Sequence, residues 1–173
     1  MDRLTLLIAF DQKKLISDLR AVIITYFINC LILLTLLILL FTLLDYQELT
    51  SILSAYQNNQ YLYFLPPTKY NFIRFLESEA LWPAAIEEVL YRGPIGFLVY
   101  YGFKFKNNGL NWLVLLSAIS YLNYQWASAH TFQLPIFIIG VPFYILVIKT
   151  KNIFAPMLCH LVFNLSLYIL AHV

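Results

Sequence analysis

The sequence predicts an all-α protein, a polytopic transmembrane helical bundle of about five spans plus an amphipathic segment. Hydrophobic residues make up 61% of the 173 residues and charged residues only 12%. Soluble proteins are usually about 45–50% apolar and roughly 25% charged. The mean hydropathy is +0.75, and it comes from long apolar runs rather than from strand-type alternation. A membrane β-barrel is therefore disfavoured.

The N-terminal third predicts the first span. Residues 1–20 mix charged and apolar side chains, and we expect an interfacial helix there. Residues 21–44 contain no charged side chain and exceed the about 20 residues that cross a bilayer. Residues 45–70 are expected to form a polar connection, in which Pro66 and Pro67 exclude a helix interior.

Four further spans follow from the rest of the chain. Residues 71–79 have the pattern of a short amphipathic helix, and Pro83 is well placed to open the next helix, since a first turn tolerates proline. The later spans are expected at residues 84–103, 110–129, 134–148 and 153–173, with Pro135, Gly140 and Pro142 loosening the fourth. No repeat or soluble boundary divides the chain, so residues 1–173 are expected to form a single integral-membrane domain.

The distribution of basic residues predicts an orientation. With five spans, the N-terminal segment and two short turns share one side of the membrane, and they hold Arg3, Lys13, Lys14, Arg20, Lys104, Lys106, Lys149 and Lys151. The positive-inside rule then places the N-terminus in the cytoplasm, and we expect a multi-pass protein of a bacterial inner membrane. The net charge of +2 is small and unclustered, so no nucleic-acid partner is expected.

One apolar stretch carries three charges within six residues: Glu87, Glu88 and Arg92. On a helix, Glu88 and Arg92 are four residues apart and can pair on one face. Glu87 points about 100° away from Glu88. Because charges inside a bilayer are costly, such a group indicates a functional site that faces the interior of the bundle.

Two later helices supply partners for these carboxylates. His160 and Asn164 are four residues apart, as are Trp126 and His130, so each pair shares one helix face. A carboxylate in an apolar site is a good general base, and a histidine beside it can hold a water. A second imidazole and an amide can donate hydrogen bonds to an oxyanion. The set therefore points to hydrolysis of a peptide bond.

These residues resemble three motifs of the CAAX-protease and bacteriocin-processing family, also called CPBP or Abi. The run E-E-V-L-Y-R-G matches the family pattern E-E-x-x-x-R. The run W-A-S-A-H, residues 126–130, matches F-x-x-x-H with Trp126 in place of phenylalanine. The run H-L-V-F-N, residues 160–164, matches H-x-x-x-N. The motifs occur in the family's order, and the motif-bearing protease core spans residues 84–167.

The resemblance implies a glutamate-dependent intramembrane endopeptidase that acts on a membrane-anchored protein or peptide. Glu87 and His130 would activate the water, while His160 and Asn164 would form the oxyanion site. Glu88 would be a supporting carboxylate with Arg92 as its ion-pair partner. The resemblance leaves open whether the substrate is prenylated.

Other interpretations of the same residues remain open. The chain could be a non-catalytic membrane scaffold or a bacteriocin-immunity protein that keeps the motifs, or a transporter with a Glu-His proton relay. No cofactor is expected, although Glu87, His130 and His160 also match the ligand set of many zinc hydrolases. The chain has no H-E-x-x-H motif. Glu88 and Arg92 could also be purely structural.

Overall fold

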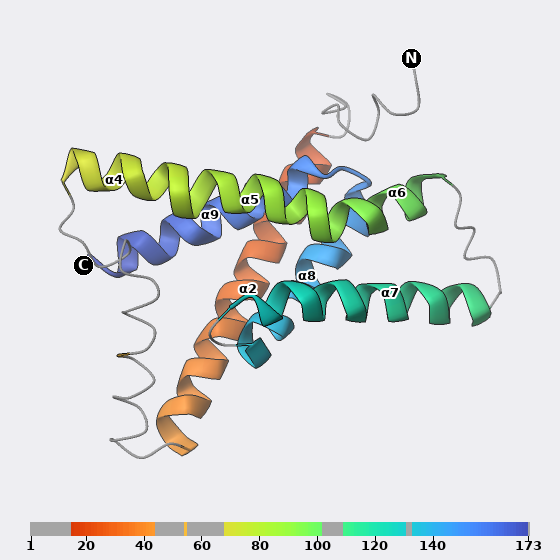
Figure 1. The fold of residues 1–173 in the computed structure, drawn as a ribbon, viewed down its shortest axis with the longest axis horizontal. Helices are drawn as coiled ribbons and strands as arrows, with labels where there is room; N and C mark the ends of the chain where they lie inside the picture. Colours follow the sequence, from red (N-terminus) through yellow and green to blue (C-terminus); the bar gives the residue numbers. More distant parts are fainter. Residues whose placement is uncertain (1–14, 44–53, 55–67, 102–108, 131–132, 173) are drawn as a thin grey trace.

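The computed structural model describes residues 15–43, 54, 68–101, 109–130 and 133–172, and every regular element in these ranges is helical (Figure 1). The elements are α2 (Leu15–Leu43), α4 (Lys69–Phe75), η2 (Leu76–Leu81), α5 (Trp82–Glu87), η3 (Glu88–Arg92), α6 (Gly93–Tyr101), α7 (Gly109–Ser128), α8 (Gln133–Thr150) and α9 (Phe154–Leu170). Of the interfacial helix expected at residues 1–20, residues 1–14 lie outside the described residues and residues 15–20 belong to α2. Most of the connection at 45–70 and residues 104–108 of the expected turn also lie outside the described residues.

Five consecutive elements, α4 to α6, form one long rod that crosses the molecule (Figure 1). α9 packs against the first half of the rod, at η2 and α5, and α7 and α8 pack against its second half, at η3 and α6. α2 packs against α8 and α9. The helices α7 and α9, which carry the second and third motifs, thus both reach the part of the rod that carries the first.

The rod corrects the prediction of an amphipathic helix that ends near residue 79, followed by a new helix. Pro83 lies in the first turn of α5, but the helix continues through it from η2. The preceding turn is a π-helix, in which the N–H of Trp82 donates to the carbonyl of Glu77, five residues earlier. Such a widened turn rearranges the hydrogen bonds ahead of a proline, so the helix is not broken.

The first helix also begins earlier than expected, at Leu15 rather than at residue 21. Its buried polar residues Asp18, Thr25 and Asn29, together with Val22, recur at spacings of four, three and four and face the bundle. The opposite face exposes large apolar side chains, including Ile24, Phe27, Leu31 and Ile38. Soluble proteins rarely expose such a continuous apolar surface, and a lipid environment accounts for it.

Two of the described helices are long and apolar enough to cross a membrane, over Leu15–Leu39 and Gln133–Thr150. Phe154–Leu170 is apolar but shorter. The all-helical fold is therefore confirmed and a membrane bundle is consistent with it, whereas the number of five spans is not confirmed.

A single glycine lets α7 and α8 approach closely. Gly140 is buried in α8, and a Cβ atom added there would lie 2.0 Å from Oδ1 of Asn123 and 2.8 Å from the ring of Trp126. Asn123 is fully buried, and its Nδ2 donates a hydrogen bond of 2.7 Å to the carbonyl of Phe137. The glycine expected to loosen this helix instead provides the space that Trp126 occupies.

The turn between α8 and α9 is held by side chains. Nδ2 of Asn152 donates to Asp18 in α2 (3.3 Å), and its Oδ1 accepts a bond of 3.0 Å from the N–H of Phe154, where α9 begins. The hydroxyl of Thr150 donates to the carbonyl of Leu146. Lys151 between them has a φ of 53°, a left-handed conformation that ordinary residues adopt only when neighbouring contacts hold it.

Candidate active site

The residues of the three motifs meet where η3, α7 and α9 come together. Glu87 and Glu88 stand at the junction of α5 and η3, Trp126 lies near the end of α7, and His160 lies in the first half of α9. Trp126 is only 3% exposed and His160 only 6%. The structure thus brings together side chains that are up to 73 positions apart in the chain, Glu87 and His160 being the outermost.

Glu88 is the most enclosed carboxylate of the cluster, with a fully buried side chain. Its Oε1 accepts a hydrogen bond of 2.9 Å from Nδ1 of His160 and lies 3.3 Å from Nη1 of Arg92. Its Oε2 has no hydrogen-bond partner among the described residues. The ion pair with Arg92 that the four-residue spacing predicts is therefore present, and His160 extends it to α9.

Arg92 is also fully buried, and aromatic rings surround its guanidinium group. The Cζ atom lies 3.9 Å from the ring centre of Trp126, 5.0 Å from that of Tyr144 and 5.4 Å from that of Phe143. A guanidinium over a ring face is attracted by the quadrupole of that ring, and more strongly when both are desolvated. The rings and Glu88 together accommodate a positive charge that would otherwise be costly in this apolar interior.

Glu87 points away from Glu88, as the helix geometry predicts, and meets a different partner. The indole Nε1–H of Trp126 donates to Oε2 of Glu87. Glu87 is only half-buried, and Oε2 is its one oxygen with a hydrogen bond from the described residues. The first carboxylate of the motif is thus held at one oxygen and accessible at the other.

His130 is placed next to Glu87 only through Trp126. Its Nδ1 lies 2.8 Å from the carbonyl oxygen of Trp126, and the two rings meet edge to face at 5.2 Å. Because a carbonyl can only accept, Nδ1 carries the proton in this bond. No hydrogen bond joins His130 to Glu87 in the described part of the chain, so the expected Glu-His pair is bridged by Trp126 rather than direct.

Asn164 ties α9 to the rod. Its Nδ2 donates a hydrogen bond of 2.9 Å to the backbone carbonyl of Glu79. Pro83, four residues after Glu79, has no N–H to donate to that carbonyl, and Asn164 provides a donor in its place. Glu79 itself precedes the span expected from residue 84. Burial raises the pKa of its carboxyl group, and the negative charge of Glu87 raises it further.

A comparison with protein-family models matches residues 70–166 to the type II CAAX prenyl endopeptidase Rce1-like family. This range covers more than half of the 173 residues and contains all three motifs. The chain belongs to this family. The resemblance that the motifs indicated is confirmed, and membership in the Rce1-like family implies a membrane-embedded protease. Curated proteins give no match, and neither do solved structures.

The structure adds one residue that the sequence analysis undervalued in this Rce1-like protein. Trp126, noted there for its spacing from His130 and as a replacement for phenylalanine, contacts Glu87 by its N–H, Arg92 by its ring face and His160 by its ring, at 6.0 Å between centres. A phenylalanine could provide the ring contacts but not the hydrogen bond. The sequence feature that could have identified Trp126 as a site residue is its four-residue spacing from His130, which places both side chains on one helix face.

The zinc interpretation has a geometric requirement, namely that three ligands converge. Within the described residues, no three His, Cys, Asp or Glu side chains group in a way that could hold a metal ion. His160 is turned toward Glu88, and Nδ1 of His130 is bonded to the backbone of α7.

Proposed function

We propose that this Rce1-like protein is an intramembrane endopeptidase that hydrolyses a peptide bond of a membrane-anchored protein or peptide. The observation that carries the proposal is the difference between its two adjacent carboxylates. Glu88 is fully buried and bonded to Arg92 and His160, whereas Glu87 is half-buried and, among the described residues, has a hydrogen bond from Trp126 alone. A general base must reach a water, and Glu87 is the carboxylate that can do so.

His130 would assist Glu87 in activating that water. With Nδ1–H donating to the carbonyl of Trp126, the neutral imidazole keeps its lone pair on Nε2. Nε2 can therefore accept a hydrogen bond from a water or carry its proton. Trp126 fixes both groups, since it binds Glu87 through its side chain and His130 through its backbone. The water would take its place between the free oxygen of Glu87 and Nε2 of His130.

His160 and Asn164 would bind the oxyanion that forms when water attacks the peptide carbonyl. Nδ1 of His160 is bonded to Glu88, so Nε2 is the nitrogen left for the substrate, and a protonated imidazole donates from it. The amide of Asn164 has two N–H groups, of which one donates to Glu79. Glu88 and Arg92 would support this arrangement without contacting the substrate.

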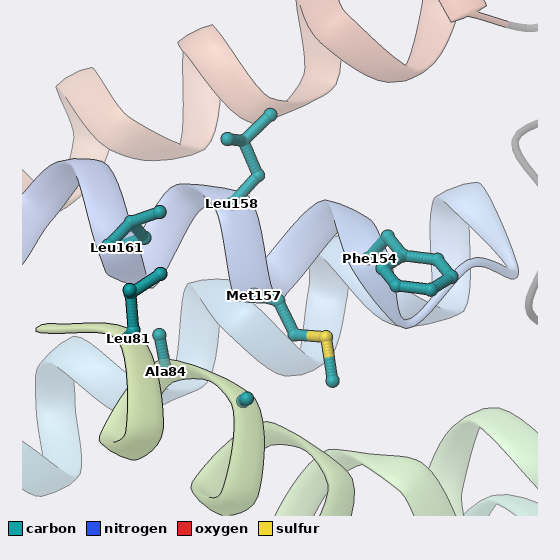
Figure 2. A pocket seen from close by; sticks show the side chains of 7 residues that line it. Leu81, Ala84, Phe154, Met157, Leu158 and Leu161 are labelled. Carbon is teal, nitrogen blue, oxygen red and sulfur yellow. The ribbon is translucent and has the colours of Figure 1, made fainter. Parts of the chain in front are cut away.

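An apolar groove lies between α9 and the part of the rod formed by the end of η2 and α5 (Figure 2). It has a volume of about 250 Å³ and is lined by Leu81, Ala84, Ala85, Phe154, Met157, Leu158 and Leu161. Ala84 is one helical turn before Glu88, and Leu161 adjoins His160. We propose that the groove holds an apolar part of the substrate, such as the prenyl group that the family's description names.

The experiment that tests the proposal compares host membranes that contain the wild type with membranes that contain Glu87→Gln, by mapping protein termini with mass spectrometry. Glu77→Gln is the matched control, because Glu77 is exposed on the same rod. A terminus present with the wild type and the control but absent with Glu87→Gln would support proteolysis. The cleavage is expected to survive a zinc chelator, since a Glu-His pair needs no metal.

Identical termini in all three membranes, at equal protein levels, would overturn the proposal and favour the scaffold or immunity interpretation.

The topology is tested separately. We propose five spans in a bacterial inner membrane, with the turns after the second and fourth spans in the cytoplasm. Single cysteines in place of Lys104 and Lys149, in a background without Cys30 and Cys159, should not react with an impermeant reagent from the outer face. Labelling from outside would contradict this topology.

A further inference from the structure

The N-terminal helix α2 lies outside residues 70–166, the range that matches the family. It nevertheless packs along α9, the helix that carries His160 and Asn164. Among the described residues, three hydrogen bonds join α2 to α9 and to the turn that precedes α9. Asn152 donates to Asp18, Cys159 to the carbonyl of Val22, and Tyr26 and Ser166 share the third.

These contacts form a regular seam. The α2 partners, residues 18, 22 and 26, are four apart, and the partners on the α9 side, residues 152, 159 and 166, are seven apart. The spacing of four keeps the α2 partners on one helix face, and the spacing of seven does the same for residues 159 and 166, whereas Asn152 lies in the turn before α9. The seam therefore fixes α9 in rotation and in position along its axis, from just before its first residue to near its end.

The middle contact adjoins the site. Cys159 is fully buried, with Sγ 3.7 Å from the carbonyl of Val22, and His160 follows it directly. Val22 and Cys159 belong to the same packed cluster as Trp126 and Phe163. A rotation of α9 away from α2 would therefore turn His160 away from Glu88.

The first contact of the seam lies directly before α9. Asn152 is 3% exposed and bonds in two directions, to the N–H of Phe154 and to Asp18, which is 6% exposed. A carboxylate within an apolar helix is costly unless it has a role and a partner. Asn152 is the partner of Asp18 among the described residues, and the role that fits is to orient the side chain that accepts from the N–H of Phe154, the first residue of α9.

We propose that Asp18 is a positioning residue of the active site, and that α2 acts through the seam to hold His160 and Asn164 in their working geometry. This inference rests on the proposed proteolysis for its kinetic consequence, but its structural consequence can be measured without any substrate. Displacing catalytic groups by about 1 Å can cost on the order of a hundredfold in rate. A loosened α2 should thus lower kcat while leaving KM nearly unchanged.

The test compares Asp18→Leu with the exchanged pair Asp18→Asn/Asn152→Asp in the full-length protein. The exchanged pair keeps one carboxylate and one amide. The amide at position 18 can donate to the carboxylate at position 152, and that carboxylate can still accept from the N–H of Phe154. Ser17→Leu is the matched control, since Ser17 is the exposed neighbour on α2. Cleavage is measured well below the melting temperature of each variant, which separates positioning from stability.

A second readout uses Trp126, which touches Arg92 and His160. Trp82 and Trp112 are exposed, at 63% and 49%, so replacing both with phenylalanine leaves Trp126 as the only tryptophan. We expect Asp18→Leu to shift the emission of Trp126 and lower kcat at least about tenfold. The exchanged pair should restore both, and Ser17→Leu should change neither.

An Asp18→Leu protein with wild-type kcat and unchanged Trp126 emission would overturn the inference, as would an exchanged pair that restores neither signal. If the wild type cleaves nothing while Asp18→Leu shifts the emission of Trp126 and the exchanged pair restores it, that result would support the seam and contradict the protease proposal. A lowered melting temperature with unchanged kcat and emission would reduce Asp18 to a structural role and so also contradict the inference.

Discussion

Nδ1 of His160 lies 2.9 Å from Oε1 of Glu88, and this hydrogen bond joins α9 to η3. The same oxygen pairs with Arg92 at 3.3 Å, and the guanidinium of Arg92 lies over the ring of Trp126 in α7. A single carboxylate oxygen therefore connects all three motif-bearing segments. The first prediction concerns its removal.

Glu88→Gln should destabilise the protein by about 3–5 kcal/mol, because it leaves the buried charge of Arg92 without its counter-ion. Glu88→Gln/Arg92→Met should recover much of that stability, since no unpaired charge remains, but should not recover activity. Thermal unfolding in detergent measures the first effect and cleavage the second. A Glu88→Gln protein as stable as the exposed control Glu77→Gln would show that the ion pair contributes little.

Trp126→Phe should fold normally and yet lose activity, by about tenfold, because it keeps the ring over Arg92 but removes the N–H that holds Glu87. A hydrogen bond to a charged group is worth about 1.5–3 kcal/mol. Steady-state cleavage kinetics measure the loss. Trp112→Phe, at a half-exposed position, is the matched control, and equal kcat values for the two variants would contradict the prediction.

Gly140→Ala should destabilise the contact between α7 and α8 by about 1–3 kcal/mol, because the new Cβ would meet Asn123 and Trp126. The comparison is Gly109→Ala. No atom lies within 4 Å of a Cβ at that position, and alanine lowers the conformational entropy of the unfolded chain, which stabilises the folded state by about 0.4–1 kcal/mol at a compatible position. The two variants should therefore change the melting temperature in opposite directions. A tolerated Gly140→Ala would mean that Trp126 can move at little cost.

Glu79→Gln should make stability less dependent on pH. The pKa of Glu79 is raised in the folded protein, first by burial and then by the charge of Glu87. The ionised carboxylate thus costs stability once the pH exceeds the folded pKa, and costs nothing below the unfolded pKa of about 4.3. The variant should be the more stable protein at pH 7–8, and the difference should vanish in acid. Parallel stability curves across this range would contradict the prediction.

Ala84→Leu should fill part of the groove between α5 and α9 and raise KM several-fold with a smaller change in kcat, because the groove is proposed to bind the substrate rather than to react with it. Val89→Leu, at an exposed position of the same rod, controls for added bulk. A lowered kcat at unchanged KM would place Ala84 in the catalytic arrangement instead. The assay requires the substrate that the terminus mapping identifies.

The sequence was sufficient to predict the helical class, the third, fourth and fifth helices and the pairing of Glu88 with Arg92. These features depend on apolar runs and on spacings of four residues, which are local properties of the chain. The observed bounds Gly109–Ser128, Gln133–Thr150 and Phe154–Leu170 lie close to the expected spans. The roles of Glu87, His130, His160 and Asn164 stay predictions.

The continuous helical rod and the contacts of Trp126 and Asn164 could not be predicted from the sequence. A proline after a polar segment ordinarily indicates a helix start, and no local pattern reveals that a π turn will carry the helix past Pro83. The bond from Asn164 to the carbonyl of Glu79 spans 85 positions and depends on which backbone group the proline leaves without a donor. The partners of α2 are likewise fixed by tertiary packing.

The second π turn, η3, makes the rod respond differently to the loss and to the gain of one residue. The N–H of Gly93 donates to the carbonyl of Glu88, five residues earlier, so η3 accommodates one residue more than an α-helical turn would. Deleting one residue between the carboxylates and Gly93 would convert the turn to α-helix and leave α6 close to its present rotation relative to α5. Adding a residue there would instead rotate α6 by about 100° and move Ile95, now fully buried, from its place against α7 and α8. Homologous chains should therefore lose a residue in this segment more readily than they gain one.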